Sequence, residues 1–219
     1  MISESVLWRY LNNNVSHQDM ILDALEKETY LKTVNPRMIS GKVQAAFLSF
    51  LCRLKQPEIV LEVGTFTGYA TIAMAKSLPE NSKILSIEHN PEWYEIAKKW
   101  IKKADVEHKV ILLFGDANHI IPSIDEKLDL VFIDGEKDEY INYYNAVFPK
   151  VNNGGLIIAD NVMWGGKIFE ETAVKKDKKT RHILKFNQFI LTDSRVRNFI
   201  LPVRDGLMII EKMATEHKR

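Results

Sequence analysis

The stretch EIVLEVGTFTGYATIAMA, residues 58–75, contains three structural signals in succession. Its first six residues form an apolar run rich in Val, Ile and Leu, which is typical of a strand buried on both faces. Two glycines then come four residues apart, and residues 69–78 have the pattern of a helix. This strand–turn–helix order is the repeating unit of an α/β protein with a parallel sheet.

The same rhythm continues along the chain. Further apolar runs predict strands at 83–88, 109–114, 128–133, 154–159, 196–201 and 207–211, with helical patterns at 91–104, 138–149 and 181–191. Only PVRDG separates the last two runs, so they should form a hairpin. The expected fold is therefore α/β, a Rossmann-like, doubly wound sheet of seven strands, mostly parallel with the last antiparallel, preceded by N-terminal helices.

Length and composition indicate one soluble globular domain, residues 1–219, with a helical cap at 1–55 and an α/β core at 56–219. The formal net charge of +1 provides no global attraction to nucleic acid or to an anionic membrane. Cys52 is the single cysteine and cannot form an internal disulfide. Residues 1–20 lack the apolar core of a signal peptide, and no apolar run could span a bilayer. We expect a cytoplasmic protein without membrane contact.

Functional residues should follow the strands, because open α/β sheets bind ligands at the carboxyl ends of their strands. After the first strand, Gly64 and Gly68 allow close approach of a ligand, and Glu62 before them suits a ligand with an ammonium group. Phe66 occupies the place of the middle glycine of the dinucleotide fingerprint, so a dinucleotide turn is excluded. The alternative is a tight turn without a ligand.

The ends of the second and third strands suit a nucleoside. Glu88 lies 24 residues beyond Gly64, where an acid can accept both ribose hydroxyls, although it could instead be a solvated helix cap. The loop GDAN, 115–118, could border an adenine ring, and a helix N-cap explains it equally well. Together, the two glycines and Glu88 favour an adenosyl ligand.

Asp134 follows the fourth strand, and the pair Asp160–Asn161 follows the fifth. Two carboxylates and an amide at one sheet edge suit a hard cation, Mg²⁺ first, with Ca²⁺ or Mn²⁺ as alternatives. The sequence has no Cys/His cluster, which argues against structural zinc. Helix capping by the two aspartates is the alternative, but it does not predict the amide beside Asp160.

These motifs, in this order, resemble the class I, S-adenosylmethionine-dependent and divalent-metal-dependent O-methyltransferases of the catechol and caffeoyl-CoA type. The matching segments are NPRMISGKVQ, LEVGTFTGYA, SIEHN, GDA, FIDGEKDEY, LIIADNV and PVRDGLMI, within residues 35–211. The resemblance implies a cation on Asp134, Asp160 and Asn161, and Lys137 as the general base. Outside this context, Lys137 would be interpreted as an exposed lysine at a helix start. The implied cofactor-binding residues are Met38, Ser40, Glu62, Gly64, Thr65, Phe66, Gly68, Tyr69, Glu88, His89, Gly115, Asp116, Ala117 and Asp134.

The sequence departs from the family pattern at three positions. Ala70 stands where many members have Ser or Thr, Glu136 where the animal catechol enzymes have tryptophan, and Arg204 where a small residue is usual. These departures leave methyl-donor chemistry in place and leave the acceptor open.

A small catechol-like or other vicinal-diol acceptor is the leading interpretation, with Trp164 as a hydrophobic wall or a packed surface aromatic. The second is tRNA, because bacterial members include enzymes that methylate a hydroxylated wobble uridine, and KKDKKTR, 175–181, holds five cations. Such a charge run is also typical of a solvated loop. A non-catalytic adenosyl-binding protein is the third possibility, which the Asp134, Lys137, Asp160 and Asn161 set opposes. The resemblance also implies a homodimer formed through the N-terminal helices.

Overall fold

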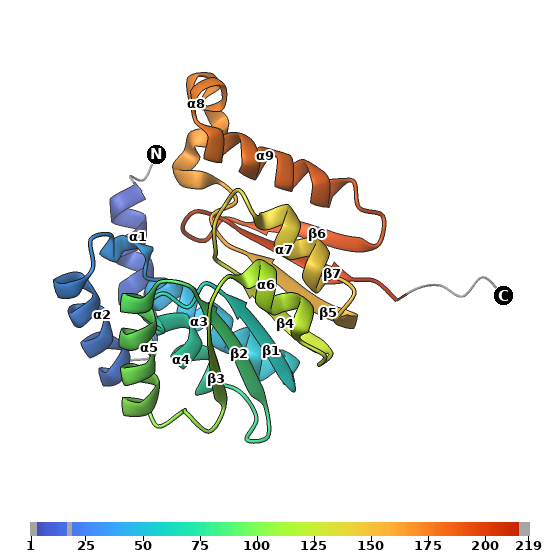
Figure 1. Cartoon of the computed structure of the whole chain (residues 1–219). Coiled ribbons are helices and arrows are strands. Elements are labelled where there is room, and N and C mark those ends of the chain that lie inside the picture. The colour runs from blue at the N-terminus through green and yellow to red at the C-terminus, as the bar shows by residue number, and fades with distance from the viewer. Residues whose placement is uncertain (1–3, 17–18, 215–219) are drawn as a thin grey trace.

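The computed structural model describes residues 4–16 and 19–214 and contains one seven-stranded sheet (Figure 1). The strands are β1 (Ile59–Val63), β2 (Lys83–Glu88), β3 (Val110–Phe114), β4 (Leu128–Ile133), β5 (Val151–Ala159), β6 (Val196–Leu201) and β7 (Leu207–Lys212). Their order is β3-β2-β1-β4-β5-β7-β6. The first five strands pair in parallel, while β7 lies antiparallel between β5 and β6. The predicted fold, including the terminal hairpin, is confirmed, and the edge strand at this end is β6.

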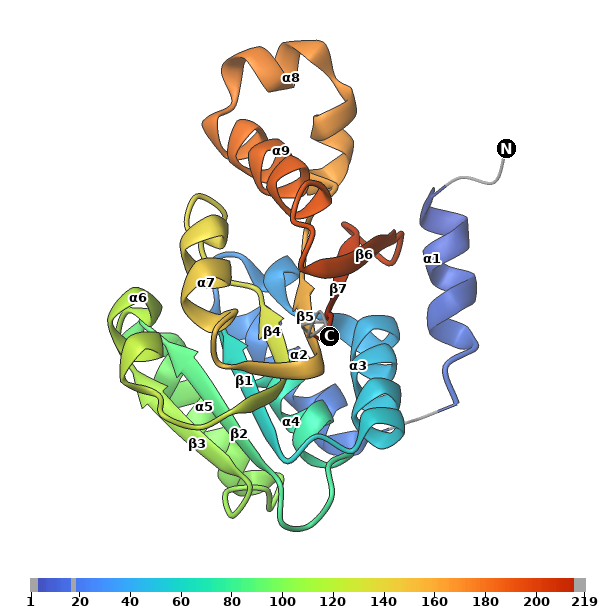
Figure 2. The same cartoon turned by 90° about the vertical axis from the view of Figure 1, so that its right-hand side faces the viewer.

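Helices cover both faces of the sheet (Figures 1 and 2). One hydrophobic cluster joins Val60 and Phe132 to α2, α3, α4 and α5, and the other joins Leu61 and Val131 to α6, α7 and α9. The two clusters differ because successive strand residues point to opposite faces. The helical elements are α1 (Glu4–Asn13), α2 (Met20–Lys32), η1 (Pro36–Met38), α3 (Gly41–Lys55), α4 (Tyr69–Ala75), α5 (Pro91–Lys103), α6 (Ala117–Ile120), η2 (Ile121–Ser123), α7 (Tyr140–Val147), η3 (Trp164–Phe169), α8 (Glu171–Lys176) and α9 (Lys178–Leu191).

The N-terminal helices pack into the same core as the sheet. Leu25 of α2 and Leu48 of α3 are fully buried in the cluster that contains α4. The hydroxyls of Thr29 and Thr67 lie 2.9 Å apart, which connects α2 to the turn after β1. The cap is therefore positioned against the carboxyl ends of the strands. None of the helices in the described part of the chain is long and apolar enough to cross a membrane.

The segment between β5 and β6 contains more helix than the sequence analysis predicted. The structure adds η3 and α8, which stand with the start of α9 at one end of the molecule (Figures 1 and 2). Helix α9 begins at Lys178 rather than at residue 181, because the Asp177 carboxylate caps it by accepting from the Lys179 amide at 2.9 Å.

Candidate active site

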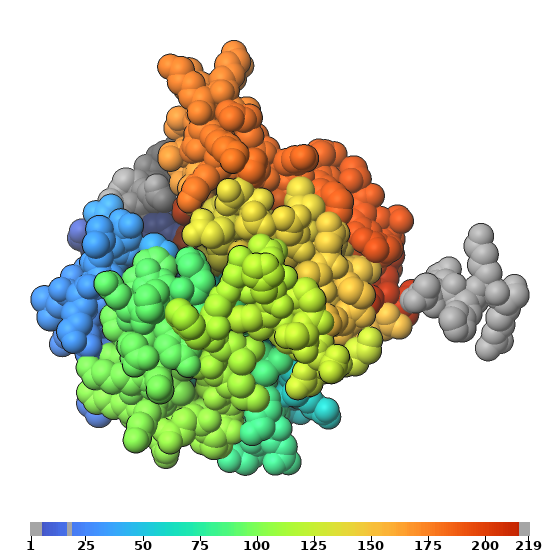
Figure 3. Space-filling view, viewed as in Figure 1, coloured from blue at the N-terminus to red at the C-terminus, as the bar shows by residue number. Residues whose placement is uncertain are grey.

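A cavity of about 870 Å³ opens at the carboxyl ends of the central strands. The space-filling view shows the hollow between the blue N-terminal segment, the orange segment around α8 and the yellow segment after β4 (Figure 3). A narrow second pocket shares part of its wall. Ser40, Thr65 and Tyr69 line only this narrow pocket. The other predicted residues found in the large cavity are Met38, Gly64, Phe66, Glu88, His89, Gly115, Asp116, Ala117, Asp134, Lys137, Asp160 and Asn161.

Gly64 brings the turn after β1 against the end of β4. Its φ is +95°, and an added Cβ would lie 2.4 Å from the Asp134 carbonyl oxygen. Only glycine combines this backbone conformation with so close an approach. The proposed cofactor turn and the proposed metal ligand are therefore neighbours. Gly68 lines neither pocket; it begins α4 and lies against Ala97 of α5.

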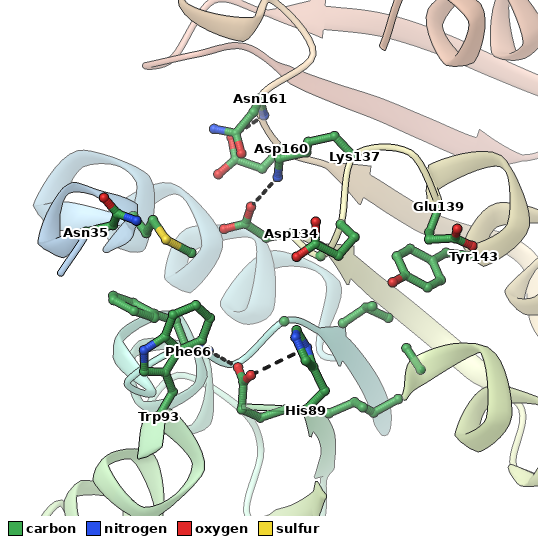
Figure 4. Close-up of a pocket in the computed structure, with 18 of the residues that line it drawn as sticks. Asn35, Phe66, His89, Trp93, Asp134, Lys137, Glu139, Tyr143, Asp160 and Asn161 are labelled. Atoms are coloured by element: carbon green, nitrogen blue, oxygen red, sulfur yellow. Dashed lines mark hydrogen bonds and ion pairs between the residues drawn. The ribbon is translucent and has the colours of Figure 1, made fainter. Parts of the chain in front are cut away.

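Glu88 presents a nearly buried carboxylate between the first two strand ends. Its Oε2 accepts from the Phe66 amide at 2.7 Å and its Oε1 from the Asn90 amide at 2.8 Å, with His89 Nδ1 3.8 Å away (Figure 4). Burial raises the pKa of Glu88 above its ordinary value. The rings of Phe66 and Trp93 pack edge to face beside it, with their centroids 4.9 Å apart. The pair forms an aromatic wall next to an acceptor of hydrogen bonds, as a nucleoside requires.

Glu62 is fully buried and lines neither pocket. It lies on the face of β1 that also carries Val60, and its Oε2 accepts from the hydroxyls of Thr71 and Ser86. Its Oε1 has no partner, and burial raises the pKa of the carboxyl to about 8. The carboxyl therefore supports the turn from behind, and its contact with a cofactor stays a prediction.

Lys137 lies at the cavity wall with 8% of its surface exposed. Its ammonium donates to Asp134 Oδ1 at 2.8 Å (Figure 4). It also donates to the Tyr140 hydroxyl at 2.7 Å. Tyr140 in turn donates to the Asp160 carbonyl at 3.0 Å. Burial raises the pKa of Tyr140 well above its ordinary value, so its hydroxyl keeps its proton. Lys137 is thus held between the ends of β4 and β5.

The Asp160 carboxylate is buried and accepts two hydrogen bonds. Its Oδ2 accepts from Gln44 Nε2 at 2.7 Å, and its Oδ1 accepts from the Asn161 amide at 2.6 Å. Burial, followed by the negative charge of Asp134, raises the pKa of Asp160. The two carboxylates are thus close enough to repel each other, and a divalent cation would remove this cost.

The three predicted ligands fit a hard cation by their chemistry. Asp134, Asp160 and Asn161 line one cavity and offer two carboxylates and an amide. Within residues 4–16 and 19–214, no group of three or more His, Cys, Asp and Glu side chains could hold a metal ion. Any cation at this site therefore depends on the Asn161 oxygen and on water or substrate.

A further part of the cavity wall comes from η3 and α9. Trp164 lines the cavity, and its indole Nε1 donates to Asp177 Oδ2 at 3.3 Å. Lys179 Nζ lies 3.5 Å from Glu136 Oε2. This ion pair connects the turn after β4 to α9 along the cavity wall. Glu136 therefore has a structural role as the partner of Lys179.

Several cavity residues were missed by the sequence analysis. Trp93 follows the Asn90–Pro91 helix start, and Tyr143 lies one turn beyond Glu139, so both positions could have been found from their helices. The family resemblance places Met38 and Ser40 at the site, but no sequence signal places Tyr30 at the cavity or Gln44 beside Asp160. The missed lining residues include Tyr30, Asn35, Trp93, Glu139 and Tyr143.

The chain is similar to known methyltransferases. Residues 12–213 match the model of the O-methyltransferase family. The chain is 33% identical to the caffeoyl-CoA O-methyltransferase of Medicago sativa over 189 residues, 80% of this chain and 75% of that protein. It is 30% identical to the flavonoid 3',5'-methyltransferase of Vitis vinifera, with 86% and 83% covered. A methyltransferase from Podospora anserina, solved with S-adenosylhomocysteine, has the same fold with a TM-score of 0.89, 22% identity and 98% of each chain covered.

The sheet order and the family match define a class I methyltransferase. The chain belongs to the O-methyltransferase family and is an S-adenosylmethionine-dependent enzyme, as its motifs indicated.

Proposed function

We propose that the protein transfers the methyl group of S-adenosylmethionine to a metal-chelated hydroxyl of a small catechol-like acceptor. The observation that supports this most is the meeting of Lys137, Asp134 and Asp160 at one cavity wall, beside the Gly64 turn. The plant relatives named above are a caffeoyl-CoA and a flavonoid methyltransferase, and both names denote phenolic substrates. A vicinal diol could offer two oxygens to one cation.

The proposed cofactor position follows the cavity from one strand end to the next. The methionine end would lie by Gly64, under Met38 and Ser40. Glu88 would accept the ribose hydroxyls, because its carboxylate is held at the cavity by two backbone amides. The adenine would lie near Ala117 and Tyr143. The further cofactor contacts proposed are Glu62, Thr65, Phe66, Gly68, Tyr69, His89, Gly115, Asp116 and Asp134.

A divalent cation would be held by Asp134, Asp160 and Asn161, with Mg²⁺ first and Ca²⁺ or Mn²⁺ as alternatives. When bound, it would orient the acceptor hydroxyl and lower its pKa. Lys137, in its neutral amine form, would take the hydroxyl proton on Nζ as the oxygen attacks and would become the ammonium. The methyl group passes in line from sulfur to oxygen, and the sulfonium leaves as neutral S-adenosylhomocysteine. Because this displacement depends on alignment, the main contribution of the chain is positioning.

A tRNA hydroxyuridine is the second candidate acceptor, favoured by the presence of Lys179 at the cavity wall. Much of the 175–181 cluster is engaged within the protein. Lys175 pairs with Glu171 at 3.7 Å, and Arg181 donates to the carbonyls of residues 174 and 175. The small acceptor is therefore placed first.

We also propose a cytoplasmic homodimer formed through the N-terminal helices. Exposed apolar side chains on α1 and α2 include Val6, Tyr10 and Leu31, and Figure 2 shows α1 at the side of the molecule. Light scattering coupled to size exclusion should give twice the chain mass. A monomer at micromolar concentration would contradict the dimer without affecting the proposed chemistry.

The acceptor is tested by offering purified protein, labelled S-adenosylmethionine and Mg²⁺ both a catechol panel and tRNA that lacks the methyl group. We expect label in a catechol, unchanged by reversing the charges of Lys175 and Lys178. Label in tRNA that disappears in the charge-reversed variant would establish the RNA alternative instead. Label in neither pool would contradict both.

A further inference from the structure

Arg204 lies in the β6–β7 connection and reaches across the cavity wall to a distant part of the chain. Its φ is 51°, in the left-handed region that residues other than glycine rarely adopt. Its Nη1 donates to the carbonyl of Ile39 at 2.5 Å and to that of Ser40, and its Nη2 donates to the carbonyl of Arg37 at 3.1 Å. One guanidinium thus holds three carbonyls within four residues of chain.

The held segment, residues 35–40, covers the donor side of the site. It contains η1, and Met38 and Ser40 line the narrow pocket together with Gly64 and Tyr69. Its local backbone hydrogen bonds are those of one short turn, Met38 to Asn35 at 3.1 Å and Ile39 to Pro36 at 3.2 Å. A single 3₁₀ turn is weak by itself. The buried Ile39 side chain anchors the end of the segment, and the three bonds from Arg204 hold its backbone carbonyls.

The same connection also holds the acceptor side. The amides of Val162 and Met163 donate to the carbonyls of Gly206 and Asp205 at 3.1 and 2.7 Å, and the Gly165 amide donates to Asp205 Oδ1 at 3.2 Å. These residues directly follow Asp160 and Asn161 in the chain. One five-residue connection is thus bonded to the donor cover on one side and to the acceptor wall on the other.

We propose that Arg204 is a positioning residue that holds segment 35–40 closed over S-adenosylmethionine and couples this cover to the acceptor wall. The proposal rests on the proposed function for the identity of the ligand. The planar guanidinium can serve carbonyls in several directions at once, whereas a lysine ammonium is a compact point charge and should replace it only in part. Loss of charge-assisted hydrogen bonds of this kind should weaken cofactor binding about tenfold to a hundredfold.

The first test measures S-adenosylhomocysteine binding by calorimetry in the wild type, Arg204→Met, Arg204→Lys and a matched control. Lys212→Met is the control, because Lys212 donates to the carbonyls of Phe148 and Val151 at 2.9 and 2.7 Å at the opposite end of β7. We expect Kd to rise at least tenfold in Arg204→Met, to take an intermediate value in Arg204→Lys and to stay unchanged in Lys212→Met. An unchanged Kd in Arg204→Met would overturn the proposal.

The second test uses trypsin, which cleaves after Arg37 inside the held segment, and needs neither acceptor nor metal. Cleavage at residue 37 should be about tenfold faster or more in Arg204→Met than in Lys212→Met, because the segment opens more often. Bound S-adenosylhomocysteine should slow it in the wild type. Equal cleavage rates in the two variants would show that Arg204 does not hold segment 35–40 closed. If the wild type does not bind S-adenosylhomocysteine, the proposed function fails, and the cleavage rates still decide whether Arg204 holds the segment.

Discussion

The ammonium of Lys137 lies 2.8 Å from Oδ1 of Asp134, three residues earlier in the chain. The single turn after β4 therefore brings the proposed general base into contact with a proposed metal ligand. A bound cation and the Lys137 ammonium would both be attracted to the same carboxylate. We expect the two positive groups to compete for Asp134. A role of Lys137 in the reaction can therefore be distinguished from a role in holding the metal, because its removal should not weaken metal binding.

Replacing Lys137 by methionine should lower kcat by roughly 10²- to 10⁴-fold, the usual contribution of a general base. Calorimetry should show that Mg²⁺ binds no more weakly than to the wild type, because the competing ammonium is gone. Steady-state assays with a catechol acceptor measure the first effect.

Lys137→Arg is the matched variant, since arginine keeps the positive charge and cannot give up its proton near neutral pH. It should be as inactive as Lys137→Met. Full kcat in Lys137→Met would show that the base lies elsewhere, and full kcat in Lys137→Arg would show that the charge alone is needed.

Gln44 should position Asp160, the proposed metal ligand, because its Nε2 donates to Asp160 Oδ2 at 2.7 Å inside the protein. Gln44→Leu removes this donor and should weaken Mg²⁺ binding about tenfold to a hundredfold, as loss of an outer-shell partner typically does. The exposed Gln188→Leu on α9 serves as the control. Equal Mg²⁺ affinity in the two variants would contradict the assignment.

In the protein without cofactor, Glu62 should make the free energy of unfolding fall as pH rises. Burial raises the pKa of its carboxyl from 4.5 to about 8 in the folded state, so below about pH 4.5 both states are protonated. Between these values the unfolded chain releases a proton that the folded chain keeps, at a cost of up to about 1.4 kcal/mol per pH unit. Glu62→Gln has no such proton, so its stability relative to the wild type should improve from pH 5 to pH 8.

Urea unfolding at several pH values measures this difference, with the exposed Glu211→Gln as the control. The unpaired amide that glutamine introduces shifts the stability equally at every pH, so the slope is the test. A pH-independent difference between Glu62→Gln and the wild type would show that Glu62 is ionised in the folded protein.

The central strands were predictable because they are buried on both faces. β1, β2 and β4 are largely apolar runs with almost the expected bounds. β5 begins three residues earlier than predicted, at Val151, because Val151 pairs with Leu128 of β4 ahead of a register shift, whereas the intervening Asn152 and Asn153 have low strand propensity. Tertiary pairing of this kind leaves no local signal.

The candidate site was predictable where it follows strand ends, as at Asp134 and Asp160. It was not predictable where distant segments meet. The bonds of Gln44 to Asp160 and of Arg204 to Ser40 join residues 116 and 164 positions apart. The sequence also did not show to which face of the sheet the Glu62 side chain points. Both faces of a central strand are apolar, so the sequence pattern does not distinguish them.

The most direct measurement of the central claim is methyl transfer to a catechol by chelator-treated protein, before and after Mg²⁺ is restored, alongside Asp160→Ala. We expect chelator treatment to abolish transfer, Mg²⁺ to restore it, and Asp160→Ala to stay inactive with Mg²⁺ while still binding S-adenosylhomocysteine. Full transfer in the presence of the chelator, together with full activity of Asp160→Ala, would show that no cation takes part.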